Sequence, residues 1–313
     1  MDLFNTVAPP TGGAEHLPTP IPVEAAGRLR DVAAFFASVQ GVTADAPLRP
    51  IVEPRLVLVS GGRAEADTAG TTEITDDAAS TATGPRDVAA QLLEQFHAGT
   101  GPTLAFAEAT GIATELVESP SPSSFEEALS LGIRTADAHA DRGVDLVLPA
   151  SLGHGDEEEA LALLGLLCSE EPVAVVGFHG TSDKRWSQRV SRVRDLMFSA
   201  RDHRGSAADI LRHLANPAMI TLVGFLAQSA SRRTPILLDT TVTCVAACYA
   251  QALAPGARDW MLAGQLTPQA GHLLAVRHLG LTPLFALNMP LGMGTGAASA
   301  MPLIRAATTL YAR

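Results

Sequence analysis

Two glycine-dense segments, 151–156 and 291–297, are the parts of this chain whose residue types could do chemistry. They contain Ser-Leu-Gly-His-Gly-Asp and Leu-Gly-Met-Gly-Thr-Gly-Ala. Each ends where an alanine- and leucine-rich helical pattern begins, so backbone N–H groups and a helix N-terminus can face a phosphate or another anion. The two segments therefore predict a site for a nucleotide-type ligand.

Three polar residues in or near such loops could exchange a proton with that ligand near neutral pH. His154 and Asp156 belong to the first segment, and His179 lies in the Gly-Phe-His-Gly-Thr sequence of 177–181. A structural interpretation competes with each of these roles. The histidines would be loop residues on a solvated rim, and the acidic run 156–159 would be a solvated helix start that the helix dipole favours. We favour the structural interpretation for both histidines and for the acidic run.

The elements that must position the loops alternate along the chain. Short apolar runs predict strands at 55–60, 113–118, 144–149, 235–239 and 260–263. Helical patterns predict helices at 24–40, 86–98, 125–142, 156–168, 216–231, 243–253, 269–279 and 297–311. A strand that leads through a glycine loop into a helix is the unit of nucleotide-binding α/β folds. We therefore predict a three-layer, doubly wound α/β fold with a mainly parallel sheet, and we expect both glycine loops on one side of it, at the C-terminal ends of strands.

Two polar segments have no predicted helix or strand. Residues 1–22 are rich in proline, which disfavours helix and predicts an extended or disordered lead-in. Residues 64–85 are rich in Thr, Ala, Asp and Gly. That segment is long enough to be a functional flap or a disordered loop.

The composition favours a small-molecule partner. Hydrophobic residues make up 47% of the chain and aromatic residues 4%, as expected where helices pack closely on a parallel sheet. The formal net charge of −11 argues against nucleic acid or an anionic membrane as a partner. The N-terminal residues do not have the pattern of a targeting peptide, and no apolar run approaches the ~20 residues that span a bilayer. We therefore expect a cytoplasmic protein.

Three cysteines, Cys168, Cys244 and Cys248, are too few and too irregularly spaced for a disulfide framework. Cys244 and Cys248 have helical spacing, but no second ligand pair lies nearby in the sequence to complete a zinc site. We expect all three to be buried small hydrophobes in a reducing cytoplasm, and we expect neither a metal nor a cofactor.

A run of short motifs from residue 232 onward follows the order and spacing of one known family. The motifs are Arg-Arg-Thr-Pro-Ile-Leu-Leu-Asp at 232–239, Leu-Ala-Pro-Gly-Ala at 253–257, Gly-His at 271–272, His-Leu-Gly-Leu-Thr-Pro at 278–283 and the 291–297 segment. They resemble the nicotinate-nucleotide:dimethylbenzimidazole phosphoribosyltransferase family. The resemblance continues more weakly upstream, through 171–178, the 151–156 loop, Val88 and Gln91, and 26–29.

The resemblance implies a large α/β domain with a smaller helical domain, assembled as a homodimer whose active site lies near the subunit interface. The lead-in would be 1–23, residues 24–50 would belong to the smaller domain, and 51–313 would form the nucleotide-binding domain. The implied reaction transfers phosphoribose from nicotinate mononucleotide to dimethylbenzimidazole. From the resemblance and the glycine loops, the expected substrate-binding residues are Gln91, Ser151, Leu152, Gly153, Gly155, Gly180, Thr181, Gly292, Gly294, Thr295 and Gly296.

The departures from the family pattern all fall at polar positions. Ser151 and Met293 stand where the family has glutamate, and Asp156 stands where it has asparagine. Met293 takes the place of the family's candidate base, and its side chain would be either a gap-filling core residue or an apolar wall against a flat ring. The other departures are Ser-Gly-Gly-Arg at 60–63 in place of Asp-His-Gly, Gln265 in place of histidine, and 215–218 in place of a Gly-Gly-acid triplet.

Two functions are compatible with this fold. The first is an enzyme, a diverged phosphoribosyltransferase that still exchanges the base on nicotinate mononucleotide or a related ribonucleotide. The second is a catalytically silent relative that binds a nucleotide or base, or supports an active paralogue as a subunit. The two differ in whether a proton acceptor reaches the incoming base. An NAD-dependent oxidoreductase is disfavoured, because no Gly-x-Gly-x-x-Gly follows a strand with an acid ~20 residues further on.

Overall fold

The structure of the protein is a computed structural model that describes residues 3–61, 85–120, 122–153, 156–178 and 182–312. The polar segment predicted as a flap or disordered loop lies, apart from its last residue, outside the described residues. The proline-rich N-terminal segment contains one short 3₁₀ turn, Ala14–His16. It is tied to the body of the protein where the Val7 N–H donates to the carbonyl of Pro255 and the Trp260 indole donates to that of Ala8.

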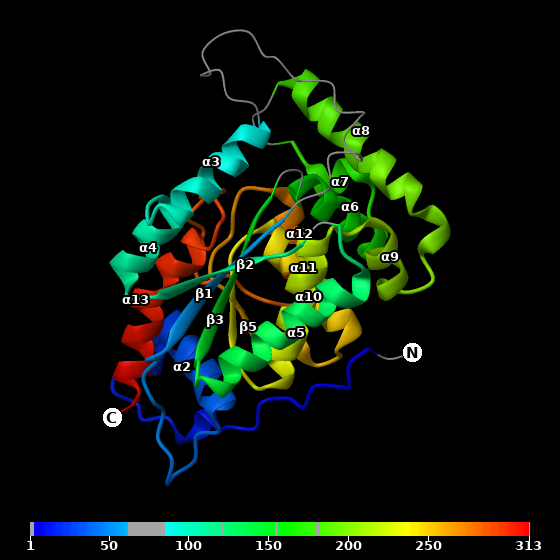
Figure 1. Cartoon of the computed structure of the whole chain (residues 1–313). Coiled ribbons are helices and arrows are strands. Elements are labelled where there is room, and N and C mark those ends of the chain that lie inside the picture. The colour runs from blue at the N-terminus through cyan, green and yellow to red at the C-terminus, as the bar shows by residue number, and fades with distance from the viewer. Residues whose placement is uncertain (1–2, 62–84, 121, 154–155, 179–181, 313) are drawn as a thin grey trace.

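A five-stranded parallel sheet forms the centre of the molecule (Figure 1). Its strands are β1 (Pro54–Ser60), β2 (Ala113–Glu118), β3 (Leu146–Leu152), β4 (Ile236–Leu238) and β5 (Met261–Ala263), in the order β2-β1-β3-β4-β5. Every recorded strand pair is parallel. Strands β1, β3 and β4 are buried almost throughout, as a parallel sheet with both faces covered requires. The predicted α/β fold with a mainly parallel sheet is confirmed.

Thirteen helices surround the sheet in the described part of the chain. They are α1 (Val23–Ala26), α2 (Arg28–Gln40), α3 (Pro85–His97), α4 (Pro102–Thr110), α5 (Phe125–Asp141), α6 (Asp156–Cys168), α7 (Pro172–Val176), α8 (Asp183–Ser199), α9 (Ala207–Leu214), α10 (Pro217–Ser231), α11 (Thr241–Leu253), α12 (Ala270–Leu279) and α13 (Thr295–Leu310). None of the helices described is long and apolar enough to cross a membrane.

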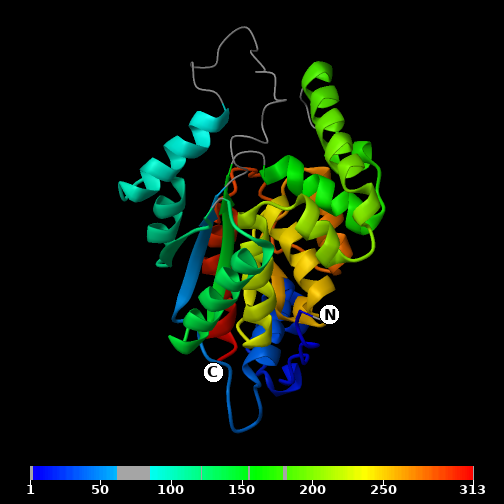
Figure 2. The same ribbon diagram turned by 45° about the vertical axis from the view of Figure 1, so that its right-hand side comes forward.

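The alternation of side chains along the strands divides the core into two halves. Val57 and Val59 of β1 face a cluster built with α5, α6, α10, α11 and α12. Leu56 and Leu58 of the same strand face a second cluster built with α2, α4 and α13. Successive residues of a strand point to opposite faces of its sheet, so one apolar strand serves both halves. Figures 1 and 2 show the resulting three layers, with α13 on one face and α5, α10 and α11 on the other.

Four helices, α4, α7, α8 and α9, were not predicted from the sequence. The longest of them, α8, extends beyond the sheet on the side opposite α3 (Figure 2). Its apolar residues Trp186, Val190, Val193 and Met197 follow helical spacing, and only Val193 and Met197 are buried, so the apolar stripe is narrow within a mostly polar sequence.

The prediction for the cysteines is confirmed for two residues and wrong for the third. Cys244 and Cys248 are free thiols that are fully buried in the core. Cys168, at the end of α6, is only partly buried, and its sulfur lies 3.4 Å from the ring nitrogen Nδ1 of His278. One side of Cys168 therefore faces the His278 imidazole and solvent, where a fully buried cysteine would be covered by core side chains.

Candidate active site

The two glycine loops meet at one cavity of about 190 Å³. The cavity lies where β3 ends and where α6 and α11 begin. Its lining residues are Leu92, Ser151, Leu152, Gly153, Asp156, Glu157, Thr240, Thr241, Val242, Gln269, Pro290, Leu291, Gly292 and Met293. Two larger cavities, beside the N-terminal segment and beside β5, contain neither loop. The prediction that both loops share one side of the sheet is confirmed, although the 291–297 loop follows no strand directly.

A buried carboxylate anchors the 291–297 loop to the end of β4. Asp239 is fully buried, and its Oδ2 accepts a hydrogen bond from the Gly294 N–H at 2.9 Å. Its Oδ1 accepts from the Ala297 N–H and from Nε2 of Gln265, each at 3.1 Å. Burial raises the pKa of Asp239 to about 6, and the donors from Gln265 and the backbone oppose the rise. The loop is thus held by a carboxylate that is ionised at neutral pH.

Glycine at position 296 is required by packing. A Cβ atom there would lie 2.0 Å from Nε2 of Gln265 and 2.3 Å from Oδ1 of Asp239. Gly294, Thr295 and Gly296 are buried and do not line the cavity. These three residues were predicted to bind substrate, but in this structure they are buried behind the cavity wall. Gly292, predicted with them, does line the cavity.

Asp156 lies at the cavity with most of its side chain buried, 7% exposed. Its Oδ2 accepts a short hydrogen bond from the Ser151 hydroxyl, and its Oδ1 accepts from Nδ2 of Asn216 at 3.1 Å. Burial raises the pKa of Asp156 to about 6, and the two hydrogen bonds limit the rise. A carboxyl with a pKa near the working pH is suited to accept a proton from a ligand.

The interpretation of the acidic run as a solvated helix start was therefore wrong for two of its residues. Asp156 is buried, and Glu159 is buried with only 2% exposed. The cause is the start of α10, because Asn216 donates its backbone N–H to Glu159 and its side-chain amide to Asp156. Asn216 also caps α10 by accepting from the Met219 N–H. The N-termini of α6 and α10 thus share one set of hydrogen bonds.

Met293 fits both interpretations that its sequence position left open. Its side chain is 5% exposed and packs in the core half formed with α13. It also lines the cavity. Its backbone lies in the left-handed region, with φ of 56°, and its carbonyl accepts from the Thr103 hydroxyl at 3.1 Å. A thioether in this position offers a ligand an apolar surface and no proton acceptor.

The other predicted site residues divide into two groups. Gln91 is exposed on α3 and does not line the cavity, whereas its neighbour Leu92 does. His154, Gly155, His179, Gly180 and Thr181 lie outside the described residues.

Sequence reasoning missed several cavity residues. Thr240 and Thr241 follow β4 and begin α11, with the Thr240 side chain in a capping box. Their place after a strand end was the signal that could have marked them. Glu157 and Gln269 were missed because they meet only in the fold, where Nε2 of Gln269 lies 2.5 Å from Oε1 of Glu157.

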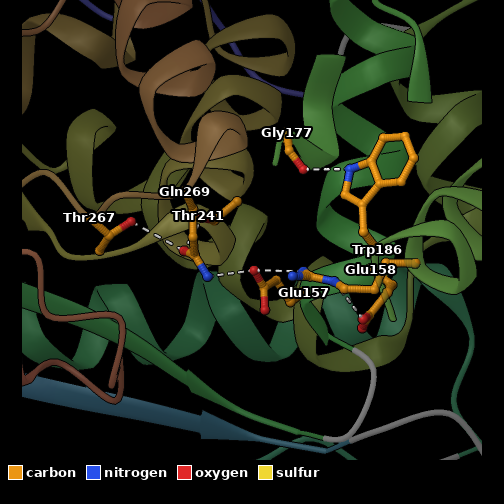
Figure 3. A network of polar contacts seen from close by, with 8 residues as sticks. Glu157, Glu158, Gly177, Trp186, Thr241, Thr267 and Gln269 are labelled. Atoms are coloured by element: carbon orange, nitrogen blue, oxygen red, sulfur yellow. Dashed lines mark hydrogen bonds and ion pairs between the residues drawn. The ribbon is translucent and has the colours of Figure 1, made fainter. Parts of the chain in front are cut away.

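No cluster of potential metal ligands occurs among the residues that the structure describes. The polar groups at the cavity are instead hydrogen-bonded to one another, as Figure 3 shows for Glu157, Gln269, Thr241 and Thr267. The arrangement is suited to hold a polar organic ligand and to accept a proton from it.

Comparisons with known proteins identify the class. Residues 121–313 match a family model described as phosphoribosyltransferase. The nicotinate-nucleotide–dimethylbenzimidazole phosphoribosyltransferase of Corynebacterium efficiens is 35% identical over 92% of this chain and 82% of that protein. The protein of the same name from Mycobacterium avium is 34% identical over 97% of this chain and 93% of its own length.

A solved structure has the same fold. The nicotinate-nucleotide–dimethylbenzimidazole phosphoribosyltransferase from Thermus thermophilus superposes with a TM-score of 0.79 at 24% identity, covering 95% of this chain and 92% of that one. The chain belongs to the nicotinate-nucleotide–dimethylbenzimidazole phosphoribosyltransferase family. The resemblance found in the sequence motifs is confirmed.

Proposed function

We propose that this protein transfers phosphoribose from nicotinate mononucleotide to dimethylbenzimidazole, releasing nicotinate and forming alpha-ribazole phosphate. One structural observation supports this proposal in addition to family membership. The carboxylate of Asp156 contacts the hydroxyl of Ser151, the residue that stands where the family pattern has glutamate. A carboxylate thus lies beside the place of that glutamate, supplied from five positions later in the chain.

The reaction needs one proton acceptor. A ring nitrogen of dimethylbenzimidazole attacks C1′ of the ribose with its lone pair, while the bond from C1′ to the nicotinate nitrogen breaks and its electrons neutralise the pyridinium. The departing ring therefore needs no proton. The new nucleotide carries an extra positive charge until the other ring nitrogen loses its proton, and the ionised carboxylate of Asp156 accepts it.

At position 293 this chain has methionine where the family has glutamate, and this replacement is compatible with turnover. A general base typically contributes ~10²–10⁴-fold, whereas holding two reactants in the right geometry contributes ~7–11 kcal/mol. Met293 and its neighbour Leu291 offer apolar surface on which a flat base can lie. We propose that positioning is the larger part of catalysis here and that Asp156 supplies the proton transfer.

A product assay tests the proposal. Nicotinate mononucleotide and dimethylbenzimidazole are each varied against a fixed concentration of the other, and nicotinate and alpha-ribazole phosphate are quantified by mass spectrometry. We expect equal amounts of the two products and saturation in both substrates. Saturable binding of nicotinate mononucleotide by calorimetry with no product would instead identify a silent binding protein.

We further propose a homodimer that covers the rim of the cavity. Leu291 of the cavity wall is 46% exposed, and Val88 of α3, the helix that carries the lining residue Leu92, is 44% exposed. Such residues commonly mark interfaces. We expect an interface of more than ~1,000 Å² and a dimer mass in light scattering at micromolar concentration. Leu291→Ser should weaken the dimer. Val52→Ser, at a site that is 70% exposed and does not line the cavity, should leave the dimer intact. A monodisperse monomer would contradict the assignment.

A further inference from the structure

Glu157 is a second carboxylate on the cavity wall, next to Asp156 in the first turn of α6. Its side chain is about one-third exposed, 34%, and lies between Gln269 and the α8 side chain Arg189. In Figure 3 it forms the centre of the polar network. The proposed chemistry does not use it.

Both donors that the described residues offer to Glu157 reach the same oxygen. Oε1 accepts from Nε2 of Gln269 at 2.5 Å and lies 2.9 Å from Nη2 of Arg189. No donor from the described residues reaches Oε2. A carboxylate oxygen can accept two hydrogen bonds, so among the described residues no donor competes with a ligand for Oε2.

The direction in which Gln269 points is determined by two threonines. Its Oε1 accepts from the hydroxyl of Thr241 at 2.8 Å and from that of Thr267 at 3.2 Å. An amide whose oxygen receives two donors must direct its NH₂ group to the acceptor on the other side, which is Glu157. Gln269 therefore fixes which oxygen of Glu157 is occupied.

Arg189 holds the carboxylate from the opposite side. Its Nε lies 3.3 Å from Oε1 of Glu158, so one guanidinium bridges two consecutive acidic residues of α6. The guanidinium pairs with both carboxylates at a partly buried position. The Glu157 carboxylate is thus oriented before any ligand enters.

A fixed anion favours only a part of the ligand that carries hydrogen-bond donors. The phosphate and the carboxylate of nicotinate mononucleotide are anionic acceptors, and its pyridinium ring carries no N–H. The ring N–H of dimethylbenzimidazole is the proton already assigned to Asp156. The ribose hydroxyls are the remaining donors. Resting on the proposed function, we infer that Oε2 of Glu157 accepts a hydrogen bond from a ribose hydroxyl and makes this residue the determinant of selectivity for ribose over deoxyribose.

The test compares nicotinate mononucleotide with its 2′-deoxy and 3′-deoxy analogues, with Kd measured by calorimetry and KM and kcat measured by product formation. A hydrogen bond to a charged acceptor predicts that the parent binds one analogue about 10–100-fold more weakly. Glu157→Gln should reduce that ratio to within about threefold. The amide oxygen can still accept from Gln269 and Arg189, but an NH₂ donor then replaces the free acceptor.

Glu158→Gln is the matched control. It loses a contact to the same Arg189 but does not line the cavity, so it should keep the parent's discrimination and a similar melting temperature. Undiminished discrimination in Glu157→Gln, or a kcat loss equal for all sugars, would overturn the inference while the proposed function stands. A parent that neither binds nor converts nicotinate mononucleotide would refute the proposed function, and this inference with it.

Discussion

Asp156→Asn should lower kcat/KM by about 10²–10⁴-fold, because it removes the proposed proton acceptor. The amide is nearly isosteric with the carboxylate. It can still accept from Asn216 through its oxygen and donate to the Ser151 hydroxyl, so we expect the free energy of unfolding to change by less than about 1 kcal/mol. Steady-state kinetics and urea unfolding measure the two effects separately.

The pH dependence of kcat/KM tests the proposed role of Asp156 in a second way. Because burial raises the pKa of Asp156 to about 6, the ionised, active form is lost as the pH falls through that value. The parent should therefore show kcat/KM rising with pH and levelling above about pH 6, and Asp156→Asn should lack this inflection. Asp195→Asn, on the exposed surface of α8, is the control and should keep the parent's rate and profile. A variant at position 156 with the parent's rate would show that this carboxyl takes no part in the reaction.

Asp239→Ala should destabilise the folded protein by about 3–5 kcal/mol, because three buried donors lose their acceptor. The substitution leaves the Gly294 and Ala297 N–H groups and the Gln265 amide buried without their acceptor, and each unsatisfied group costs about 1–3 kcal/mol. Urea unfolding monitored by circular dichroism checks the value. The exposed Asp195→Ala should change stability by less than about 0.5 kcal/mol. A loss below about 1 kcal/mol at position 239 would mean that the 291–297 loop does not depend on this anchor.

The sequence patterns located most of the sheet and its covering helices because buried parallel strands are nearly continuous apolar runs. Helix α6 lies at the predicted residues 156–168, and so does strand β2 at 113–118, although β2 is an edge strand in which only Val117 is buried. Strand β3 was predicted at 144–149 but runs from Leu146 to Leu152, into the glycine loop. Its last residues are ordered by pairing with β1, a contact between segments about ninety positions apart that local patterns do not contain.

The site was predictable only where its residues follow local rules. Strand, glycine loop and helix succeed one another around residue 153, so the place of the cavity followed from the sequence. The burial of Asp156 depends on Asn216, sixty positions later, and on the docking of α10 against α6. The orientation of Glu157 depends on Gln269 and Arg189 from two other helical regions. Such contacts can be read only from the fold.

The most direct test of the account is the initial rate of alpha-ribazole phosphate formation by the double variant Ser151→Glu, Asp156→Asn, relative to the parent and to Asp156→Asn alone. The double variant moves the carboxylate from position 156 to position 151, where the family pattern has glutamate, and leaves the number of acids at the cavity unchanged. If the role of Asp156 is to supply that carboxylate, the double variant should work within about tenfold of the parent, and Asp156→Asn should be about 10²–10⁴-fold slower. A folded double variant as slow as the single one, or a parent that forms no product, would contradict the account.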